Sequence, residues 1–298
     1  MKFNQLRCFL AVAQHRSIRA AARALPLSQP AVTKCLRELE RDLGVPLVVR
    51  GVGGAQLTEF GEAFRLRASL LMEEARRARE ELTLMRDGDR ATLSVAVGST
   101  VALTLLPPAV AAFRQAFPKA QLSLWEEVLP STLKRLRDGS LDLVVMQSTP
   151  DAQETDFDVN PLYTMQSIVG ARAQHPLVRS RSLRSLLDAQ WLLPTSALEE
   201  RSPFKDMFGA HGLPMPSRIT SCYSLTLALG LIKQMDFLAL FAAPLAAGEF
   251  ARHGLKALPL REKLAPSSVS LITRKGSRHT YVAQAFMEVL ERLAKQMR

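Results

Sequence analysis

The sequence predicts a protein of three parts: a small helical head that ends in a short β-hairpin, one long helix, and a larger α/β region. Three observations support this fold class. Two short helical patterns joined by a tight turn open the chain, and a proline-free helical pattern follows over residues 58–86. From residue 92 onward, strand and helix patterns alternate. A chain of 298 residues has room for two or more domains with cores of their own.

The composition excludes several classes of protein. Hydrophobic residues at 47% and charged residues at 22% are typical of a globular chain and argue against disorder. No apolar run approaches the roughly 20 residues that cross a bilayer, and no convincing cleavage site follows the first apolar stretch. We therefore expect a cytoplasmic protein with neither a membrane span nor a secretory signal. The widely separated Cys8, Cys35 and Cys222 predict no disulfide framework and no metal site.

Basic residues concentrate at the start of the chain. Lys and Arg number 39 against 28 Asp and Glu, which gives a net charge of +11. Residues 1–57 alone hold nine basic and three acidic side chains, so about half of the excess lies in the first fifth of the chain. This balance favours a polyanionic partner.

The first segment has the pattern of a helix-turn-helix. Apolar positions at helical spacing predict a helix over residues 3–15, and Ser17 is placed to cap a short alanine-rich helix over residues 18–25. After a proline turn, Ser28 can cap a further helix that Gly44 ends. Two short helices joined by a tight turn, the second with a polar and basic leading edge, make a helix-turn-helix.

If the second of these helices enters a major groove, its first turns expose side chains suited to base edges and phosphates. The candidates are Ser28, Gln29, Thr33 and Lys34, with Arg37 and Arg41 continuing the basic side. The helices alone leave a second interpretation open, a helical hairpin whose charged face is only solvated.

Two short strands are predicted next, over residues 47–50 and 55–57, joined by the glycine-rich residues 51–54. Beside a helix-turn-helix, such a hairpin is a wing. Gly51-x-Gly53 also fits the start of a dinucleotide-binding fingerprint, but the third glycine position falls on Gln56 and no βαβ unit surrounds it. We discard that interpretation.

An ordered set of motifs runs through this head. It comprises the apolar run at 9–13, SIRAAA at 17–22, LSQPAVT at 27–33, Leu39-Glu40, LGVPL at 43–47 and LTEFG at 57–61. In these motifs the chain closely resembles the LysR-type transcriptional regulators. The resemblance implies that Gln29, Pro30, Thr33 and Lys34 contact bases, and that Arg50 lies where the wing approaches phosphate or the minor groove. The wing tip departs from the family pattern, because residues 51–54 carry no basic side chain.

The long helical pattern carries an apolar stripe at steps of three, four or seven residues. Its members are Leu57, Phe60, Phe64, Leu71, Ala75, Ala78, Leu82 and Met85. A second copy of the same helix is the most economical cover for such a stripe, although packing on the chain's own head stays open. The resemblance also implies dimerisation, with two linker helices pairing two DNA-binding heads. Asp87-Gly88-Asp89 is expected to break the helix and act as a hinge.

The patterns after residue 92 begin with a strand at 92–97 and one helix at 101–117, and they predict an α/β domain. In the LysR family this region resembles periplasmic solute-binding proteins, with a small effector held between two α/β subdomains. The resemblance implies a winged helix-turn-helix at 1–58, a linker helix at 59–88 and an effector domain at 92–298. Its first subdomain would comprise residues 92–162 and 267–298, and its second residues 163–266.

Ser99 and Thr100 follow the first strand of this domain. Their hydroxyl and backbone N–H groups suit a carboxylate, although ordinary helix capping explains them equally well. Other loop residues fall roughly where family members line the effector cleft: Leu129, Pro130, Gln147, Thr195, Ser196, Pro203 and Phe204. This mixture of apolar groups with few hydrogen-bonding side chains suits a small organic or aromatic acid better than a sugar.

The chain contains no GxSxG, GxxxxGK[ST] or HExxH motif, and the spacing of its five histidines suggests neither catalysis nor metal binding. We therefore expect a LysR-type regulator, not an enzyme and without a cofactor, that binds double-stranded promoter DNA as a dimer, within a homotetramer, and responds to an effector. Two alternatives stay open. An α/β scaffold can carry hydrolase or transferase chemistry, and a plain solute-binding protein would share the second half, although the basic head and the missing export signal argue against it.

Overall fold

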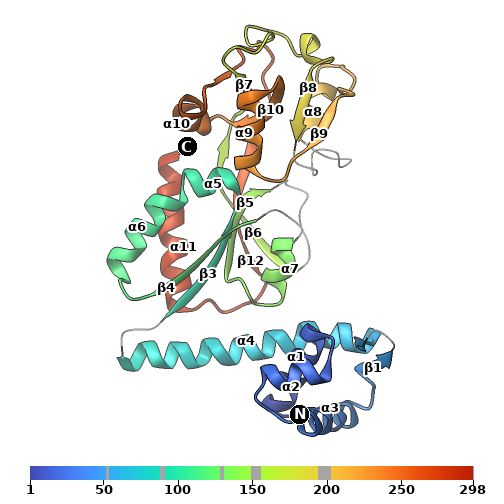
Figure 1. The fold of residues 1–298 in the computed structure, drawn as a ribbon. Coiled ribbons are helices and arrows are strands. Elements are labelled where there is room, and N and C mark those ends of the chain that lie inside the picture. Colours follow the sequence, from blue (N-terminus) through green and yellow to red (C-terminus); the bar gives the residue numbers. More distant parts are fainter. Residues whose placement is uncertain (52–53, 88–90, 128–130, 149–155, 194–202, 298) are drawn as a thin grey trace. The chain divides into compact units, whose positions relative to one another are not determined.

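The structure, a computed structural model, describes residues 1–51, 54–87, 91–127, 131–148, 156–193 and 203–297 (Figure 1). The chain divides into two compact units. The first holds residues 1–93 with the short segments 119–121 and 133–142, and the second holds the remaining residues. In the part of the chain that the structure describes, no helix is both long and apolar enough to cross a membrane.

Three helices form the head: α1 Phe3–His15, α2 Ile18–Ala24 and α3 Gln29–Leu43. The expected caps at Ser17 and Ser28 are confirmed, because each serine hydroxyl accepts a hydrogen bond of 3.3 Å from the backbone N–H three residues later. Gly44 ends α3 with a φ of 74°, a left-handed conformation that glycine adopts without steric cost. The helix-turn-helix predicted from the sequence is therefore present.

The wing is an antiparallel hairpin of β1 Val48–Gly51 and β2 Gly54–Leu57. Two contacts fix it to the helices. The Glu40 carboxylate of α3 accepts hydrogen bonds from the N–H groups of Leu47 and Val48, at 2.8 and 3.0 Å. The Ala55 N–H of β2 donates to the Arg16 carbonyl at 2.9 Å. The wing is thus tied both to α3 and to the turn between α1 and α2.

The core of the head forms around α1, which packs against α2, α3 and the long helix. Phe9, Leu39 and Leu47 are fully buried there, and the Phe9 ring lies 5.3 Å from the ring of Phe64. Cys8 is buried in the adjoining cluster of apolar side chains, and this burial raises the pKa of its thiol to about 12. The thiol therefore stays neutral and packs like a small apolar residue.

The long helix is α4, Glu59–Asp87. Thr58 caps it, since the Thr58 hydroxyl accepts a hydrogen bond from the Gly61 N–H at 2.9 Å and donates one to the Pro46 carbonyl at 2.7 Å. Thr58, the residue that caps the helix, is therefore also bonded to the segment that leads into the wing.

The apolar stripe of α4 divides between two faces. Phe64, Ala68 and Met72 pack against the core of the head. Phe60 and Leu82 are 56% and 66% exposed, and Leu71 between them is 44% exposed. The helix therefore packs on its own head along one side and presents an apolar face along another.

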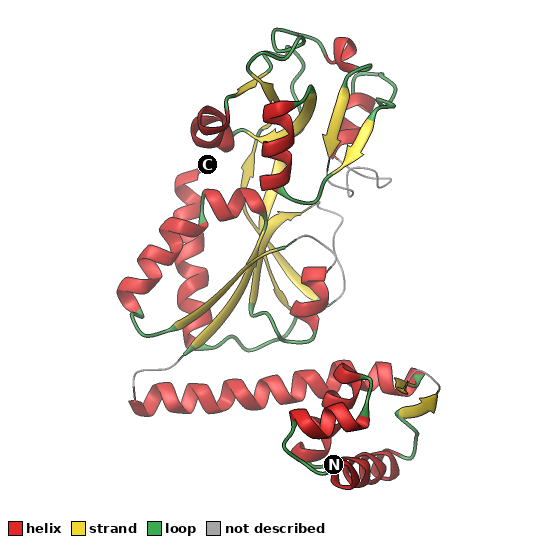
Figure 2. Cartoon of the chain, viewed as in Figure 1, coloured by secondary structure: helices red, strands yellow, loops and turns green. Residues whose placement is uncertain are grey.

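The α/β region contains two five-stranded sheets (Figure 2). The first has the strand order β4-β3-β5-β12-β6. Its strands are β3 Thr92–Val97, β4 Gln121–Glu126, β5 Leu143–Ser148, β6 Phe157–Met165 and β12 Ser267–Arg274. The accompanying helices are α5 Ser99–Leu103, α6 Leu106–Ala116, α7 Ser131–Arg137 and α11 Tyr281–Ala294, followed by a short 3-10 helix, Lys295–Met297. Helices α6 and α11 lie side by side (Figure 1), and their Phe113 and Phe286 rings meet edge to face at 5.2 Å.

The second sheet has the order β11-β7-β10-β8-β9. Its strands are β7 Ser167–Arg172, β8 Gln190–Leu193, β9 Ile219–Ser221, β10 Phe237–Ala242 and β11 Leu255–Ala257. Its helices are α8 Pro203–Gly209, α9 Leu225–Gln234, α10 Pro244–His253 and a 3-10 turn, Leu183–Leu186. The chain leaves the first sheet through β6 and returns through β12, and these two strands pair antiparallel.

Two details differ from the sequence prediction. The single helix expected over residues 101–117 is divided into α5 and α6, because Pro107 and Pro108 in the first turn of α6 lack backbone N–H groups and disfavour a helical conformation just before them. Strand β6 continues to Met165, beyond the subdomain boundary expected at residue 162.

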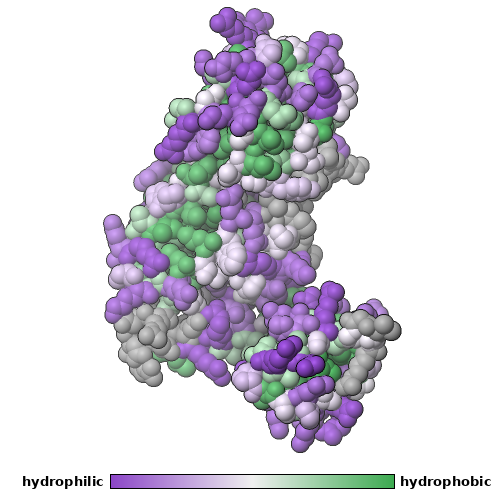
Figure 3. Space-filling model, viewed as in Figure 1, coloured by the Kyte–Doolittle hydropathy of each residue, from purple (hydrophilic) through white to green (hydrophobic). Residues whose placement is uncertain are grey.

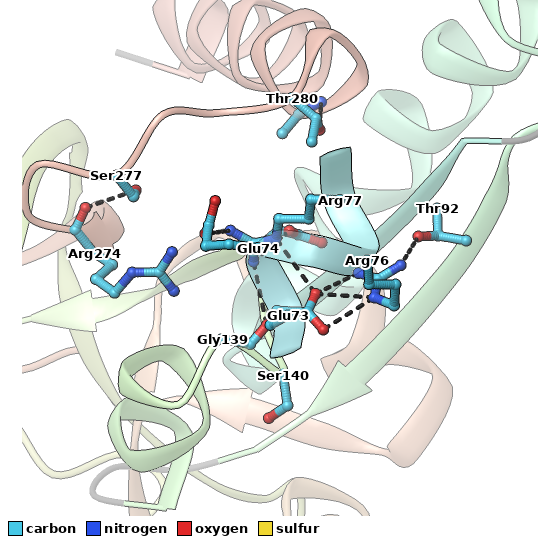
Figure 4. Close-up of polar contacts among 12 residues, drawn as sticks. Glu73, Glu74, Arg76, Arg77, Thr92, Gly139, Ser140, Arg274, Ser277 and Thr280 are labelled. Atoms are coloured by element: carbon cyan, nitrogen blue, oxygen red, sulfur yellow. Dashed lines mark hydrogen bonds and ion pairs between the residues drawn. The ribbon is translucent and has the colours of Figure 1, made fainter. Parts of the chain in front are cut away.

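A buried arginine joins α4 to the loop before β5 (Figure 4). Arg77 is only 7% exposed, and its guanidinium lies 2.8 Å from the Asp142 carboxylate and donates to the Gly139 carbonyl at 3.2 Å. On α4 itself, Glu73 and Glu74 accept hydrogen bonds from the same guanidinium at 3.3 and 3.2 Å. These contacts fix the second half of α4 to residues 139–142.

The start of α4 leaves no room for a side chain at Gly61. A Cβ there would lie 2.1 Å from the Leu47 carbonyl oxygen, so we expect Gly61→Ala to destabilise the protein by about 3 kcal/mol. At Gly230 in α9 a Cβ would meet nothing within 4 Å, so Gly230→Ala is expected to stabilise it by about 0.5–1 kcal/mol. Urea unfolding followed by circular dichroism measures both changes, and an unchanged midpoint for Gly61→Ala would contradict the packing described.

The Arg77 contacts predict a second difference in stability. Asp142→Asn removes the nearest carboxylate from a buried guanidinium, and we expect this to cost about 3 kcal/mol. The matched control is Glu62→Gln, which breaks the exposed 3.1 Å pair with Arg65 on the same helix and is expected to cost less than about 1 kcal/mol. Chemical unfolding measures both losses of stability. Equal losses in the two variants would show that the buried ion pair stabilises the protein no more than the exposed pair does.

Candidate nucleic-acid interface

One face of α3 forms a shallow groove that is open to solvent. The residues that line it are Gln29, Pro30, Thr33, Lys34, Arg37, Glu38 and Arg41. Six of these seven are among the eight side chains that the sequence analysis assigned to DNA contact. The structure therefore brings most of that predicted set together on one surface.

The helical period explains why these side chains share a face. On the opposite side of α3, Val32 and Leu39 are fully buried and Leu36 is 6% exposed. Because successive positions advance by 3.6 residues per turn, burial of this set turns the polar set outward. Ser28 lies just before the groove, where its hydroxyl is engaged by the N–H of Ala31 as the helix cap.

The carboxylates and the groove cations of the head differ in whether they have partners within the head. Each of its three carboxylates has a partner within the head: Glu38 bonds to Gln5, Glu40 to the backbone of residues 47 and 48, and Asp42 to the terminal amine of Met1. The cations of the groove are Lys34, Arg37 and Arg41, which are exposed and form no ion pair among the described residues. The groove therefore presents positive charge that phosphate groups can neutralise.

The wing follows α3 and is bonded to it through Glu40. Arg50 belongs to β1, where its backbone pairs with Ala55 of β2. Its side chain and residues 52–53 at the wing tip lie outside the described residues. Contact of the wing with DNA stays a prediction.

Two residues are not predicted from the sequence: Glu38, which lines this surface, and Gln5, the buried side chain that bonds to it. Glu38 lies four residues after Lys34 and three before Arg41, and this spacing alone places it on the same face of α3. Gln5 gives no such signal, because it comes from α1 and is 4% exposed.

The residues expected to hold an effector fall in the α/β region. Strands β3 and β5 are parallel neighbours, and the Gly98 N–H donates to the Val145 carbonyl at 3.0 Å. Ser99 and Thr100 follow the carboxyl end of β3, and Gln147 is the last residue but one of β5, so the three residues share the edge of the sheet at which α/β proteins bind ligands.

Two of these side chains already have partners. The Ser99 hydroxyl donates to the Glu126 carboxylate at the end of β4, at 2.5 Å. The Gln147 amide donates to the Ser267 hydroxyl at 3.1 Å. A carboxylate of the protein thus occupies the position in which the sequence analysis expected the carboxylate of a ligand.

Most of the other residues predicted to bind an effector lie outside the part of the chain that the structure describes. Leu129, Pro130, Thr195 and Ser196 lie outside the described residues, and Pro203 begins α8 with its side chain undescribed. Phe204 is 1% exposed, and its ring packs against Trp191 at 4.9 Å and Phe208 at 5.2 Å. Its ring belongs to the apolar core of this part of the chain. Among the residues that the structure describes, no three His, Cys, Asp or Glu side chains gather as a metal site would require.

A winged helix-turn-helix with a basic groove, followed by an α/β domain with polar groups at its strand ends, defines the class of ligand-responsive DNA-binding proteins. Two family models narrow this class. The model described as "Bacterial regulatory helix-turn-helix protein, lysR family" matches residues 3–62, and "LysR substrate binding domain" matches residues 86–295. The chain belongs to the LysR family of DNA-binding transcriptional regulators, which are not enzymes as a family.

Similar proteins extend over nearly the whole chain. The transcriptional regulator TdcA of Escherichia coli K12 is 27% identical over 288 residues, which are 97% of this chain and 92% of TdcA. PcaQ of Agrobacterium fabrum is 28% identical over 302 residues, covering 100% of this chain and 96% of PcaQ. Among solved structures, CbnR, a LysR family transcriptional regulator, covers 99% of each chain with a TM-score of 0.72 at 24% identity. Full-length CbnR complexed with its target DNA gives a TM-score of 0.71, also at 24% identity, covering 98% of this chain and 99% of that one.

Proposed function

We propose that this regulator binds double-stranded promoter DNA with α3 in the major groove. The single observation that carries the proposal is the solvent-exposed groove along α3, which combines hydrogen-bonding and cationic side chains. Gln29, Pro30, Thr33 and Lys34 lie near the start of the helix and would contact base edges. Arg37, Arg41 and the wing residue Arg50 would neutralise phosphates. The solved complex of CbnR with its target DNA supports this role through the shared fold.

Self-association is part of the proposal. Phe60, Leu71 and Leu82 are spaced eleven residues apart on α4, a repeat that returns to the same helix face after three turns. In the α/β region, Figure 3 shows apolar side chains gathered over α6 and α9, and the large exposed residues include Leu103 and Leu227, at 44% and 56%. Apolar surface of this kind supports a dimer that assembles further into a tetramer. A dimer would place two copies of α3 on an interrupted dyad sequence.

The α/β domain is proposed to bind a small organic or aromatic acid at the edge formed by Ser99, Thr100 and Gln147, and to carry out no reaction on it. Because Glu126 already contacts Ser99, an acid must displace this carboxylate before it can bind there. Effector binding changes DNA binding only if the two conformational states differ in affinity for the effector.

Thermal unfolding of the full chain tests this effector class. The probes are benzoate, 4-hydroxybenzoate and 2-oxobutyrate, with glucose and ribose as the sugar controls. We expect an acid to raise Tm, and to raise it further in Glu126→Gln, because a neutral amide does not repel a carboxylate. Stabilisation by the sugars alone would contradict the proposal, and an acid effect that Glu126→Gln leaves unchanged would place the site elsewhere.

Two substitutions in α3 test the role of the groove. We expect Gln29→Ala to weaken binding to the operator by about 1–3 kcal/mol while leaving binding to scrambled DNA nearly unchanged. Arg41→Ala is expected to weaken both about equally and to reduce the salt slope by about one, because a phosphate contact carries no sequence information.

The measurement is fluorescence anisotropy over a salt series, with the duplex from immediately upstream of the protein's own gene and a scrambled duplex. Salt must be varied because phosphate contacts alone give non-specific affinity. An equal loss on both duplexes for Gln29→Ala would refute its assignment to bases. Equal, salt-sensitive binding of the unaltered protein to both duplexes would contradict recognition of this operator.

A further inference from the structure

We propose that Glu38 determines sequence preference by accepting a hydrogen bond from a cytosine amino group in the major groove, and that Gln5 positions it. The inference rests on the proposed entry of α3 into that groove. It starts from a residue whose charge is opposite to that of the surface around it: Glu38 lines the same groove as Lys34 and Arg41. A carboxylate there opposes binding to phosphates, so its presence calls for a different partner.

Glu38 does not serve to neutralise its neighbours. Lys34 and Arg41 stand four residues before it and three after it, the spacings at which helical ion pairs form. Among the described residues, neither cation pairs with Glu38, and the one hydrogen bond to its carboxylate comes from the Gln5 side chain at 3.4 Å. The carboxylate is therefore turned toward α1, and the cations stay available for DNA.

The direction of the Gln5 amide is set by the backbone. Its oxygen accepts a hydrogen bond from the Lys2 N–H at 2.7 Å, so its nitrogen must be the atom that points to Glu38. Gln5 is 4% exposed, and its side chain is held by the start of α1 before any DNA binds. An amide fixed in this way orders one carboxylate oxygen, Oε2, at the edge of the groove.

The second carboxylate oxygen of Glu38, Oε1, is the atom available to a DNA base. Within the described residues, Oε1 receives no hydrogen bond, while Glu38 is only partly buried. A carboxylate is an acceptor only, so it can bind the exocyclic amino groups of cytosine and adenine and is repelled by the acceptors of guanine and thymine. In adenine the amino group lies beside the acceptor N7, whereas in cytosine no acceptor of the same base adjoins it. The donor and acceptor pattern of the bases therefore favours cytosine.

Selection from a pool of duplexes with a randomised core tests the proposal. The full-length protein, Glu38→Ala and Glu38→Gln are each allowed to select DNA, and the selected pools are sequenced. We expect the unaltered protein to prefer cytosine at one position of each half-site by a factor on the order of ten. Glu38→Ala is expected to lose that preference, and Glu38→Gln to shift it toward adenine, because glutamine can bond to adenine N6 and N7 together.

Gln5→Met separates positioning from direct contact. This substitution replaces the amide with an apolar side chain of similar length, which still fills the buried site. We therefore expect a weaker preference for cytosine at the same position and unchanged preferences elsewhere. The matched control for charge is Asp42→Asn. Asp42 lies on the same helix, outside the groove, and is paired with the Met1 amine. Asp42→Asn is expected to alter overall affinity and its salt dependence while leaving every base preference unchanged.

The outcomes are distinct. If Glu38→Ala and Glu38→Gln select the same sequences as the unaltered protein, Glu38 acts only through its charge and the inference is wrong. A uniform gain in affinity in both variants and in Asp42→Asn would lead to the same conclusion. If the unaltered protein selects no sequence at all, the proposed function itself fails, and the inference fails with it.

Discussion

The apolar core of the head is the constraint on which the interface depends. Val32, Leu36 and Leu39 lie on one side of α3 and are buried in that core, so the helix cannot turn without exposing them. Burying each such side chain contributes about 1.5–3 kcal/mol, more than the roughly 0.5–1.5 kcal/mol of a typical hydrogen bond. The polar side of α3 therefore faces solvent for reasons of packing. The backbone positions that carry its side chains are fixed before a ligand arrives, which lowers the entropic cost of binding.

Electrostatics and connectivity depend on the same core. The Glu40 carboxylate accepts hydrogen bonds from the residues that lead into the wing and so holds the wing to α3. The Asp42 carboxylate binds the terminal amine. The basic excess of the head is left on its surface. Thr58 then links the segment before the wing to the first turn of α4, and Arg77 links the second half of that helix to residues 139–142. A continuous series of hydrogen bonds and packed side chains thus runs through this unit of the chain.

The head could be predicted from the sequence because its signals are local. The caps at Ser17 and Ser28 and the turn at Gly44 each act within a few residues, and the same helical period placed the side chains of the groove on one face. The contacts of Gln5 with Glu38 and of Arg77 with Asp142 join residues far apart in the sequence, and no local sequence pattern predicts such contacts. In the α/β region, β6 contains Pro161 and lacks a clear alternation, and the apolar run of β10 fits a buried helix as well as a strand.

Entry of α3 into the major groove is tested most directly by dimethyl sulfate protection of the duplex upstream of the gene, with the protein bound. The reagent methylates guanine N7 in the major groove and adenine N3 in the minor groove. Entry of α3 into the major groove predicts protected guanines in two half-sites on one face of the duplex, with that protection at the bases nearest α3 reduced in Gln29→Ala. Protection confined to adenine N3, or no guanine protection at salt concentrations where the protein stays bound, would contradict entry of α3 into the major groove.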